Sequence, residues 1–386
     1  MKIEQVKVWM VEGVKYNWTL LKIYADSGET GVGEATNWPG SPMIAAAAQH
    51  AGERIVGLDP LRTDFIWTKL YRDLNWVGPG GASLCAISGL DMALLDLKAK
   101  HYGMPLYQLL GGPVRTSIRL YANYWFAGGG LTPEEYGKAA QRVRAMGFRG
   151  VKFDPFAHVN YLYGDSLEPS LSLTEERKEI AVNVTRAVRE AIGPDADLMI
   201  ETHAMLNFRT AVEMAERLKP FQITWFEEPV GPENPETLAA ARRRIPAEIP
   251  IVVGERHYTR YGFRPVLEQH LSDVIMPDIT RCGGPSELKR IATMAETYGA
   301  MVAPHNPNGP LSTLASAHVC ATLPNFFRQE FMFNDVPWRD SVITRPIPLQ
   351  NGALELDETP GLGVDLVESE MDAHPGVTKP RDGFYV

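Results

Sequence analysis

The sequence predicts an α/β protein in which a parallel barrel follows a smaller α+β domain. Eight short apolar segments alternate with helical segments after about residue 116, and most of them end in a polar side chain. Strands that alternate with helices form parallel sheets, and eight such strands favour a closed barrel. The preceding part has the pattern of antiparallel strands followed by helices, which indicates a separate domain.

The composition is that of a soluble globular enzyme with a sizeable core. The 386 residues are 45% hydrophobic and 22% charged. The net charge of −9 and the lack of a basic run argue against nucleic-acid and membrane partners, and no apolar run is long enough to span a membrane. Cys85, Cys282 and Cys320 are few, odd in number and scattered, as in reduced cytoplasmic proteins. The N-terminus starts with strand-like alternation, so we expect no signal peptide.

The first domain begins with strand patterns between residues 3 and 35, which include a hairpin turn at Asp26–Glu29. Apolar residues then follow helical spacing, most clearly in Gly89–Lys100. We place the domain boundaries so that the barrel is flanked by this domain and by a Gly- and Pro-rich tail that returns to it: 1–115, 116–345 and 346–386.

The barrel strands are expected at eight places: Ile118–Asn123, Gly150–Asp154, Asp197–His203, Ile223–Glu228, Ile251–Glu255, Asp273–Asp278, Met301–His305 and Phe326–Glu330. Helices are expected between most of them, as at Pro133–Met146, Thr174–Ile192, Ala211–Leu218 and Pro285–Tyr298. Active-site groups of such barrels lie at the carboxyl ends of the strands. The polar residues that end these segments are therefore the candidate site.

Three successive strand patterns end in glutamate. Glu201, Glu227 and Glu255 follow one another at about the length of a strand–helix–strand unit, roughly 30 residues. Their carboxylates would therefore meet at one mouth of the barrel. Three oxygen ligands with positions left open for water and substrate suit a hard cation such as Mg²⁺. Strand alternation alone does not decide between Glu227 and its neighbour Glu228.

Two histidines share this end of the barrel. His203 follows Glu201 by two residues, and alternation along a strand would turn both to the same side. Asp278 ends the sixth strand pattern and His305 the seventh. An aspartate bonded to one ring nitrogen fixes the tautomer and raises the basicity of the other, so we expect His305 with Asp278 to act as a general base.

The chain resembles the enolase superfamily in its mandelate racemase subgroup, and within it the acid-sugar dehydratases typified by D-galactonate dehydratase. The resemblance runs nearly end to end, and its carriers include Gly89–Asp96, Phe226–Pro229, Gly254–Arg256, Ala303–Pro310 and Pro360–Gly363. It implies a modified TIM barrel, (β/α)7β, under an α+β capping domain that the C-terminal tail completes. It also implies a homo-oligomer.

The resemblance implies a reaction that removes the proton α to a carboxylate, with Mg²⁺ held by Glu201, Glu227 and Glu255. Most relatives carry Asp at the position of Glu201. Glu228 would point elsewhere and pair with a cation, for which Lys152 is the natural candidate.

The remaining roles concern substrate and leaving group. His203, across the mouth, would protonate a departing β-hydroxyl, or alternatively would only orient Glu201. Glu330 on the last strand would hydrogen-bond the substrate carboxylate. Lys152 would supply positive charge to the developing anion.

Asp154 decides between reaction types. Racemases of the subgroup carry Lys-x-Lys on the second strand, whereas this chain has Lys152-Phe153-Asp154. Proton transfer at one carbon needs acid–base groups on both faces, but β-elimination needs one base and an acid for the leaving group. The sequence therefore predicts dehydration of a sugar acid, an aldonate or aldarate, to a 2-keto-3-deoxy acid, with Asp154 in contact with substrate.

Three alternatives stay open beside dehydration. A lactone cycloisomerase or an epimerase of the same superfamily is the nearest. A metal-dependent barrel hydrolase is disfavoured because the chain lacks the His-x-His pair such enzymes use. A binding protein that lost its chemistry is disfavoured because every expected position carries a competent group.

Substrate specificity is expected from lids on the capping domain. Asn17 and Trp18 lie in one candidate lid and Trp76 in a second, between Leu74 and Gly81. The alternative is that the tryptophans only pack between domains. A third candidate is the long connection Pro155–Ser172.

Overall fold

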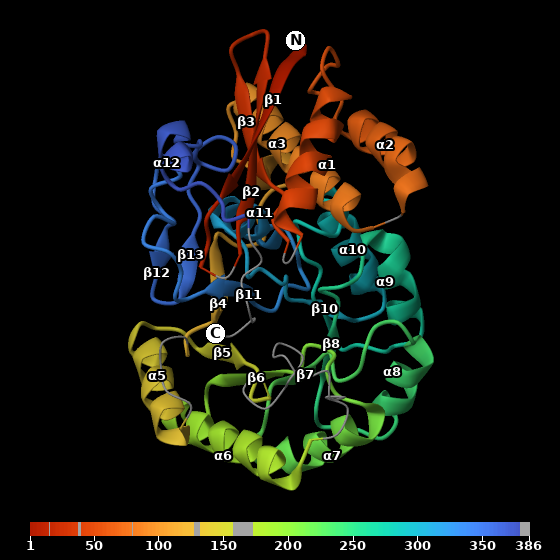
Figure 1. Ribbon diagram of the computed structural model, residues 1–386, viewed down its shortest axis with the longest axis vertical. Coiled ribbons are helices and arrows are strands. Elements are labelled where there is room, and N and C mark those ends of the chain that lie inside the picture. The colour runs from red at the N-terminus through yellow and green to blue at the C-terminus, as the bar shows by residue number, and fades with distance from the viewer. Residues whose placement is uncertain (15, 38–39, 79, 127–131, 157–172, 379–386) are drawn as a thin grey trace.

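The computed structural model of the chain describes residues 1–386 except for residues 15, 38–39, 79, 127–131, 157–172 and 379–386. Figure 1 shows two parts along the long axis of the molecule: a layered α+β part at one end, and a ring of strands surrounded by helices at the other. Residues 157–172 of the third candidate lid thus lie outside the described residues.

An antiparallel sheet organises the capping part, in the order β1 (Ile3–Val11), β2 (Trp18–Ala25) and β3 (Thr30–Glu34). The helices of this part are α1 (Ser41–Glu53), α2 (Thr63–Leu74), η1 (Asn75–Val77, a 3₁₀ turn), α3 (Ala82–His101) and α4 (Leu106–Leu109). Helices α1 and α3 pack on the sheet, and α3 also contacts α10 of the barrel. Because it is covered on nearly all sides, α3 is apolar around most of its circumference.

Asp96 of α3 shows how the capping part is held together. One of its buried carboxylate oxygens accepts the backbone N–H of Val32 at 2.9 Å, and the other accepts that of Leu362 at 2.7 Å. Lys100, one turn later, pairs with the same carboxylate at 2.6 Å. A single side chain therefore joins the sheet, the central helix and the C-terminal segment.

The barrel is built from alternating strands and helices. Its strands are β4 (Ser117–Asn123), β5 (Gly150–Phe153), β6 (Asp197–Glu201), β7 (Trp225–Glu227), β8 (Ile251–Val253), β9 (Val274–Ile275), β10 (Met301–Val302) and β11 (Gln329–Met332). The helices between them are α5 (Pro133–Ala145), α6 (Glu175–Ile192), α7 (Phe208–Leu218), α8 (Pro235–Arg242), α9 (Thr259–Glu268), α10 (Pro285–Thr297) and α11 (Pro310–Ala321). A further 3₁₀ turn, η3 (Lys219–Phe221), follows α7.

Strand pairing closes the ring. Strands β4 to β10 pair in parallel in chain order, and β11 returns to pair with β4. Val302 of β10 bridges to Phe326, just before β11, which joins the two ends. The described residues thus form eight strands with seven intervening helices, and the predicted (β/α)7β fold is confirmed.

The inside of the barrel is apolar below its mouth. Side chains from successive strands fill it as one cluster, namely Tyr121, Met199, Trp225, Val252, Val274, Met276 and Ala303. Such a packed interior makes the barrel a rigid platform rather than a channel. The polar side chains of the candidate site lie at or near the ends of the strands, on the side that faces the capping part.

The C-terminal segment returns to the capping part, as predicted. Pro375 bridges to Val11 of β1, and Glu368 of α12 (Glu368–Ala373) pairs with Lys7 of β1 at 2.9 Å. On the way, β12 (Leu349–Gln350) and β13 (Ala353–Glu355) form a hairpin that adds to β4. This hairpin was not predicted. The exact domain boundaries remain a prediction.

Candidate functional site

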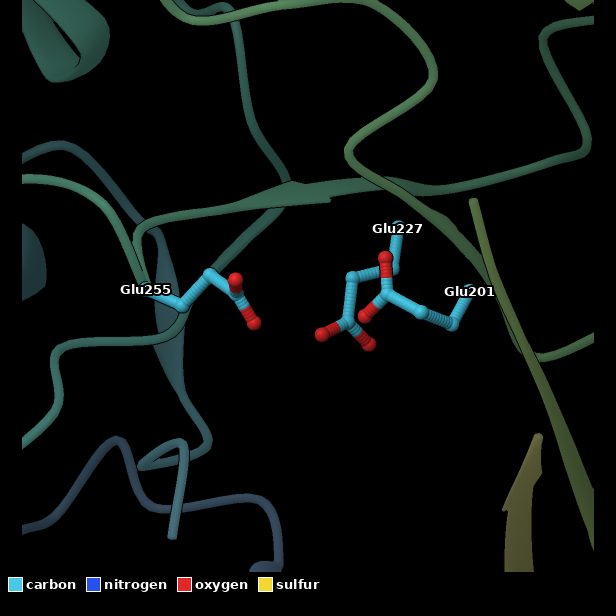
Figure 2. A group of neighbouring side chains, drawn as sticks. All are labelled: Glu201, Glu227 and Glu255. Carbon is cyan, nitrogen blue, oxygen red and sulfur yellow. The ribbon is translucent and has the colours of Figure 1, made fainter. Parts of the chain in front are cut away.

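Three glutamates converge at the mouth of the barrel. Glu201 and Glu227 are the last residues of β6 and β7, and Glu255 follows β8 by two residues. All three are buried, and one carboxylate oxygen of each lies within 4.8 Å of the others. Figure 2 shows Glu201 and Glu227 side by side with Glu255 approaching from the opposite side. The strand spacing thus places the three carboxylates together.

The donor set fits a divalent cation. Glu201 Oε2 is buried and accepts no hydrogen bond from the described residues. Lys152 Nζ lies 2.8 Å from Glu227 Oε1 and 3.5 Å from Glu201 Oε2, whereas Arg256 and His305 lie beside Glu255, at 3.4 and 2.9 Å. Glu201 and Glu227 thus share one ammonium group, and uncompensated buried charge is costly. A hard cation with oxygen ligands would complete the balance.

Glu228 turns away from this cluster. Its φ of +43° redirects the chain directly after β7, and its Oε2 accepts a hydrogen bond from Arg256 Nε at 2.7 Å. The expected pairing of Glu228 with Lys152 is therefore wrong, since Lys152 Nζ pairs with Glu227 and Glu330 instead. Burial raises the pKa of Glu228 to about 8.

The first histidine–aspartate pair lies beside Glu255. His305 Nδ1 is 2.7 Å from Asp278 Oδ2, and His305 Nε2 is 2.9 Å from Glu255 Oε2. The other oxygen of Asp278 accepts the backbone N–H of Thr280 at 2.8 Å, which fixes the carboxylate. Burial lowers the pKa of His305, but the negative charges of Glu255 and Glu330 outweigh it and raise the pKa to about 9.

A second pair lies on the opposite flank. His203 Nδ1 is 2.7 Å from Asp154 Oδ2, although sequence reasoning had assigned Asp154 to the substrate. Strand β6 ends at Glu201, and His203 has a φ of +49°, so simple strand alternation does not describe this residue. Burial lowers the pKa of His203, but Glu201 and Asp154 outweigh it and leave the pKa raised.

Glu330 of β11 is held by several donors. Its Oε1 accepts from Asn123 Nδ2 at 2.6 Å and lies 3.0 Å from Lys152 Nζ. Its Oε2 accepts the backbone N–H of Asn306 at 2.7 Å. Asn123, the last residue of β4, is a site residue that sequence reasoning missed. An asparagine at a strand end gives no signal that sets it apart from an ordinary loop residue.

The capping residues expected to act as lids differ in what they contact and in how exposed they are. Tyr16 reaches the barrel, where its hydroxyl donates to the carbonyl of Pro307 at 2.5 Å. Asn17 instead exchanges two hydrogen bonds with the backbone of Val377, at 2.7 and 2.9 Å. Trp18 is buried in the main core, whereas Trp76 is 94% exposed. Contact of Asn17, Trp18 and Trp76 with substrate stays a prediction.

Two family models match the chain. The model "Mandelate racemase / muconate lactonizing enzyme, N-terminal domain" matches residues 6–111, and "Enolase C-terminal domain-like" matches residues 135–370. The chain belongs to the mandelate racemase/muconate lactonizing enzyme family of the enolase superfamily. The predicted superfamily is confirmed, and with it the prediction that the chain is an enzyme.

Members of the family with different activities resemble this chain to a similar degree. D-xylonate dehydratase of Haloferax volcanii is 32% identical over 378 residues, which cover 97% of this chain and 89% of that protein. D-galactarolactone cycloisomerase of Agrobacterium fabrum is 34% identical over 357 residues, with coverages of 90% and 88%. A solved enolase-superfamily structure from Salmonella Typhimurium superimposes with a TM-score of 0.88 at 32% identity, covering 97% of this chain and 99% of its own.

Two further features of the described residues concern membrane-spanning helices and disulfide bonds. No helix among the described residues is long and apolar enough to cross a membrane. Cys85, Cys282 and Cys320 are all free and buried.

Proposed function

We propose that this enzyme is a Mg²⁺-dependent dehydratase of a sugar acid, an aldonate or a related aldarate. In the reaction, a base removes the proton on the carbon next to the carboxylate. The hydroxyl on the following carbon leaves as water after receiving a proton. The resulting enol becomes a 2-keto-3-deoxy acid. We place the enzyme in the cytoplasm, which its three free buried cysteines support.

Glu201, Glu227 and Glu255 would hold the Mg²⁺. Bound there, the ion supplies positive charge that offsets the negative charge developing on the substrate carboxylate. Lys152 contributes a fixed positive charge in the same place, because its ammonium group is buried between Glu227 and Glu330.

His305 would be the base that removes the α-proton. Asp278 holds its Nδ1, so Nε2 is the ring atom that accepts and releases protons. The contact between Nε2 and Glu255 shows that this nitrogen faces the carboxylate cluster. His203, on the other flank, would protonate the departing hydroxyl.

The identity of the residue at position 154 favours dehydration over racemisation. A racemase of this family needs a second base across from the histidine, supplied by the second lysine of Lys-x-Lys. This chain has a buried aspartate there, and that aspartate binds His203. The site thus offers one base and one acid on opposite flanks, as β-elimination requires.

Lactone cycloisomerisation is the second candidate, favoured by the 34% identity to D-galactarolactone cycloisomerase. It shares the removal of an α-proton but releases no water. An epimerase would likewise return a product of unchanged composition.

A screen of five- and six-carbon aldonic, aldaric and lactone substrates with Mg²⁺ separates these reactions. A dehydratase yields a 2-keto-3-deoxy acid. Semicarbazide traps this acid as a semicarbazone, which absorbs in the ultraviolet. Turnover of a lactone to an isomeric product of unchanged mass apart from deuterium taken up from D₂O would instead establish the second candidate. No turnover of any substrate would contradict both.

A further inference from the structure

His203 is held in place by its own backbone. Its φ of +49° lies in the left-handed region, which residues other than glycine rarely adopt. The backbone N–H of His203 donates to Glu201 Oε1 at 2.7 Å, and its carbonyl accepts from Arg256 at 3.1 Å. Such a conformation persists only where the surroundings determine it. The point from which the imidazole ring extends is therefore fixed.

The ring is fixed as well. Asp154 Oδ2 lies 2.7 Å from His203 Nδ1, and Asp154 Oδ1 accepts the backbone N–H of Phe156 at 2.7 Å. Because both carboxylate oxygens are used, the carboxylate has one orientation. A carboxylate only accepts hydrogen bonds, so Nδ1 of His203 carries the proton and Nε2 is the nitrogen that exchanges protons with the substrate.

The same construction occurs on the other flank of the glutamates. Asp278 holds His305 Nδ1 with one oxygen and the backbone N–H of Thr280, two residues later, with the other. In both pairs the aspartate follows one strand, β5 or β9, and the histidine follows the next, β6 or β10. Two matching pairs therefore face the carboxylate cluster from opposite sides.

We propose that Asp154 is a positioning residue for His203, and that it acts on the leaving-group side of the reaction rather than on the substrate. The proton moves from His203 Nε2 to the β-hydroxyl oxygen, which leaves as water with the electron pair of the broken C–O bond. Asp154 keeps the ring in the orientation and tautomer from which this transfer occurs. This inference rests on the proposed dehydration.

The test compares two leaving groups in Asp154→Asn. The probes are the aldonate that the wild type dehydrates fastest in the screen and its 3-deoxy-3-fluoro analogue, because fluoride departs without receiving a proton. We expect kcat for loss of water to fall by about 10²- to 10⁴-fold, as for loss of a general acid. Loss of fluoride should fall by less than about tenfold, and α-proton exchange in D₂O should persist.

Two variants control for unspecific effects. Asp91→Asn also neutralises a buried carboxylate, but Asp91 of α3 binds Ser286 of α10 rather than either histidine, so this variant should leave both reactions unchanged. His305→Asn should lose both reactions, because both begin with removal of the α-proton.

Each other outcome is decisive. Equal losses for water and fluoride in Asp154→Asn, or no loss for either, would overturn the inference and leave the dehydratase intact. Loss of α-proton exchange in this variant would make His203 a base and overturn it too. A wild type that eliminates neither water nor fluoride would overturn the proposed function itself.

Discussion

Glu227 is the residue at the centre of the charged cluster. Its carboxylate is fully buried, with Lys152 at 2.8 Å from one oxygen and Trp225 Nε1 donating to the other at 2.9 Å. Burial raises the pKa of Glu227 well above its ordinary range, because neither water nor enough positive charge surrounds it. A bound divalent cation would stabilise the ionised carboxylate and so lower this pKa.

Glu227→Gln should therefore abolish turnover and weaken Mg²⁺ binding. Glutamine keeps the size of the side chain but removes one anionic ligand, so we expect Mg²⁺ affinity by calorimetry to fall by at least about 10²-fold. Glu228→Gln is the matched control, since this neighbour is equally buried but binds Arg256. A control that lost Mg²⁺ affinity while Glu227→Gln kept it would assign the ligand to Glu228.

His305→Asn and His203→Asn should separate the base from the acid. If His305 removes the α-proton, His305→Asn loses both dehydration and exchange of that proton with D₂O. His203→Asn should lose dehydration but keep the exchange. Each loss should be about 10²- to 10⁴-fold, measured by trapped keto acid and by NMR of the exchanged position. The reverse pattern would show that the substrate binds in the opposite orientation.

The sequence was sufficient to group the three glutamates and to join His305 with Asp278, since both follow from strands that end at one mouth. It was not sufficient to pair His203 with Asp154. That contact depends on the left-handed backbone at His203, and a strand pattern carries no information on the direction of the chain after the strand ends. The partner of Glu228 was wrong for the same reason, because Glu228 also has a positive φ.

At the scale of elements, the long amphipathic helices were predictable and the atypical ones were not. Helix α11 is buried on all sides, so its sequence has no polar face that would reveal a helical period. It also begins directly after Asn306–Gly309, a segment with the composition of a loop. Helix α9 contains Pro265, a residue that argues against helix. The β12–β13 hairpin turns at Asn351–Gly352, a strong hairpin signal, but the strands on either side are only two and three residues long and carry almost no alternating pattern.

Helix α11 also carries a pH-sensitive contact. His318 is buried there, and its Nδ1 accepts the backbone N–H of Tyr107, next to the start of α4, at 3.2 Å. Nδ1 of His318 must therefore carry no proton in the folded protein. Burial lowers the pKa of His318 to about 4, against 6.5 for the free side chain.

We expect this histidine to make the protein less stable in acid. Between pH 4 and 6.5 the unfolded chain binds the proton and the folded chain does not. The free energy of unfolding is therefore unaffected by this histidine above pH 6.5. It falls as the pH falls from 6.5 towards 4, by roughly 3 kcal/mol in total. The melting temperature of the wild type should fall more steeply over this window than that of His318→Gln, followed by calorimetry. Parallel profiles would refute the role of His318.

At the scale of the whole molecule, the capping part completes the barrel rather than standing apart from it. Glu34, the last residue of β3, accepts the backbone N–H groups of Gly309 and Ser312 at the start of α11, at 2.6 and 2.9 Å. The carboxylate thus serves as the N-terminal partner of a barrel helix. Together with Tyr16, which binds Pro307, it holds the capping sheet over the mouth. A site that excludes water strengthens every charge interaction within it.

The capping part carries several exposed large apolar side chains. Trp76 and Val77 of η1 are 94% and 77% exposed, and Met43 of α1 and Phe65 of α2 are also exposed. Exposed large apolar side chains are often found at surfaces that bind another protein. The predicted homo-oligomer therefore gives Trp76 a second candidate role beside contact with the substrate, at a contact between subunits.

Trp76→Asp tests this assignment because the two roles of the tryptophan give different readouts. At an interface, a buried negative charge without a partner is costly, so the mass measured by light scattering at micromolar concentration should fall towards that of one chain. The KM of the variant should then change little. As a lid over the substrate, Trp76 would instead alter KM and kcat while the mass stays unchanged. Glu53→Gln, an exposed change at the end of α1, controls for the altered surface charge. A wild type of monomeric mass would contradict the predicted oligomer.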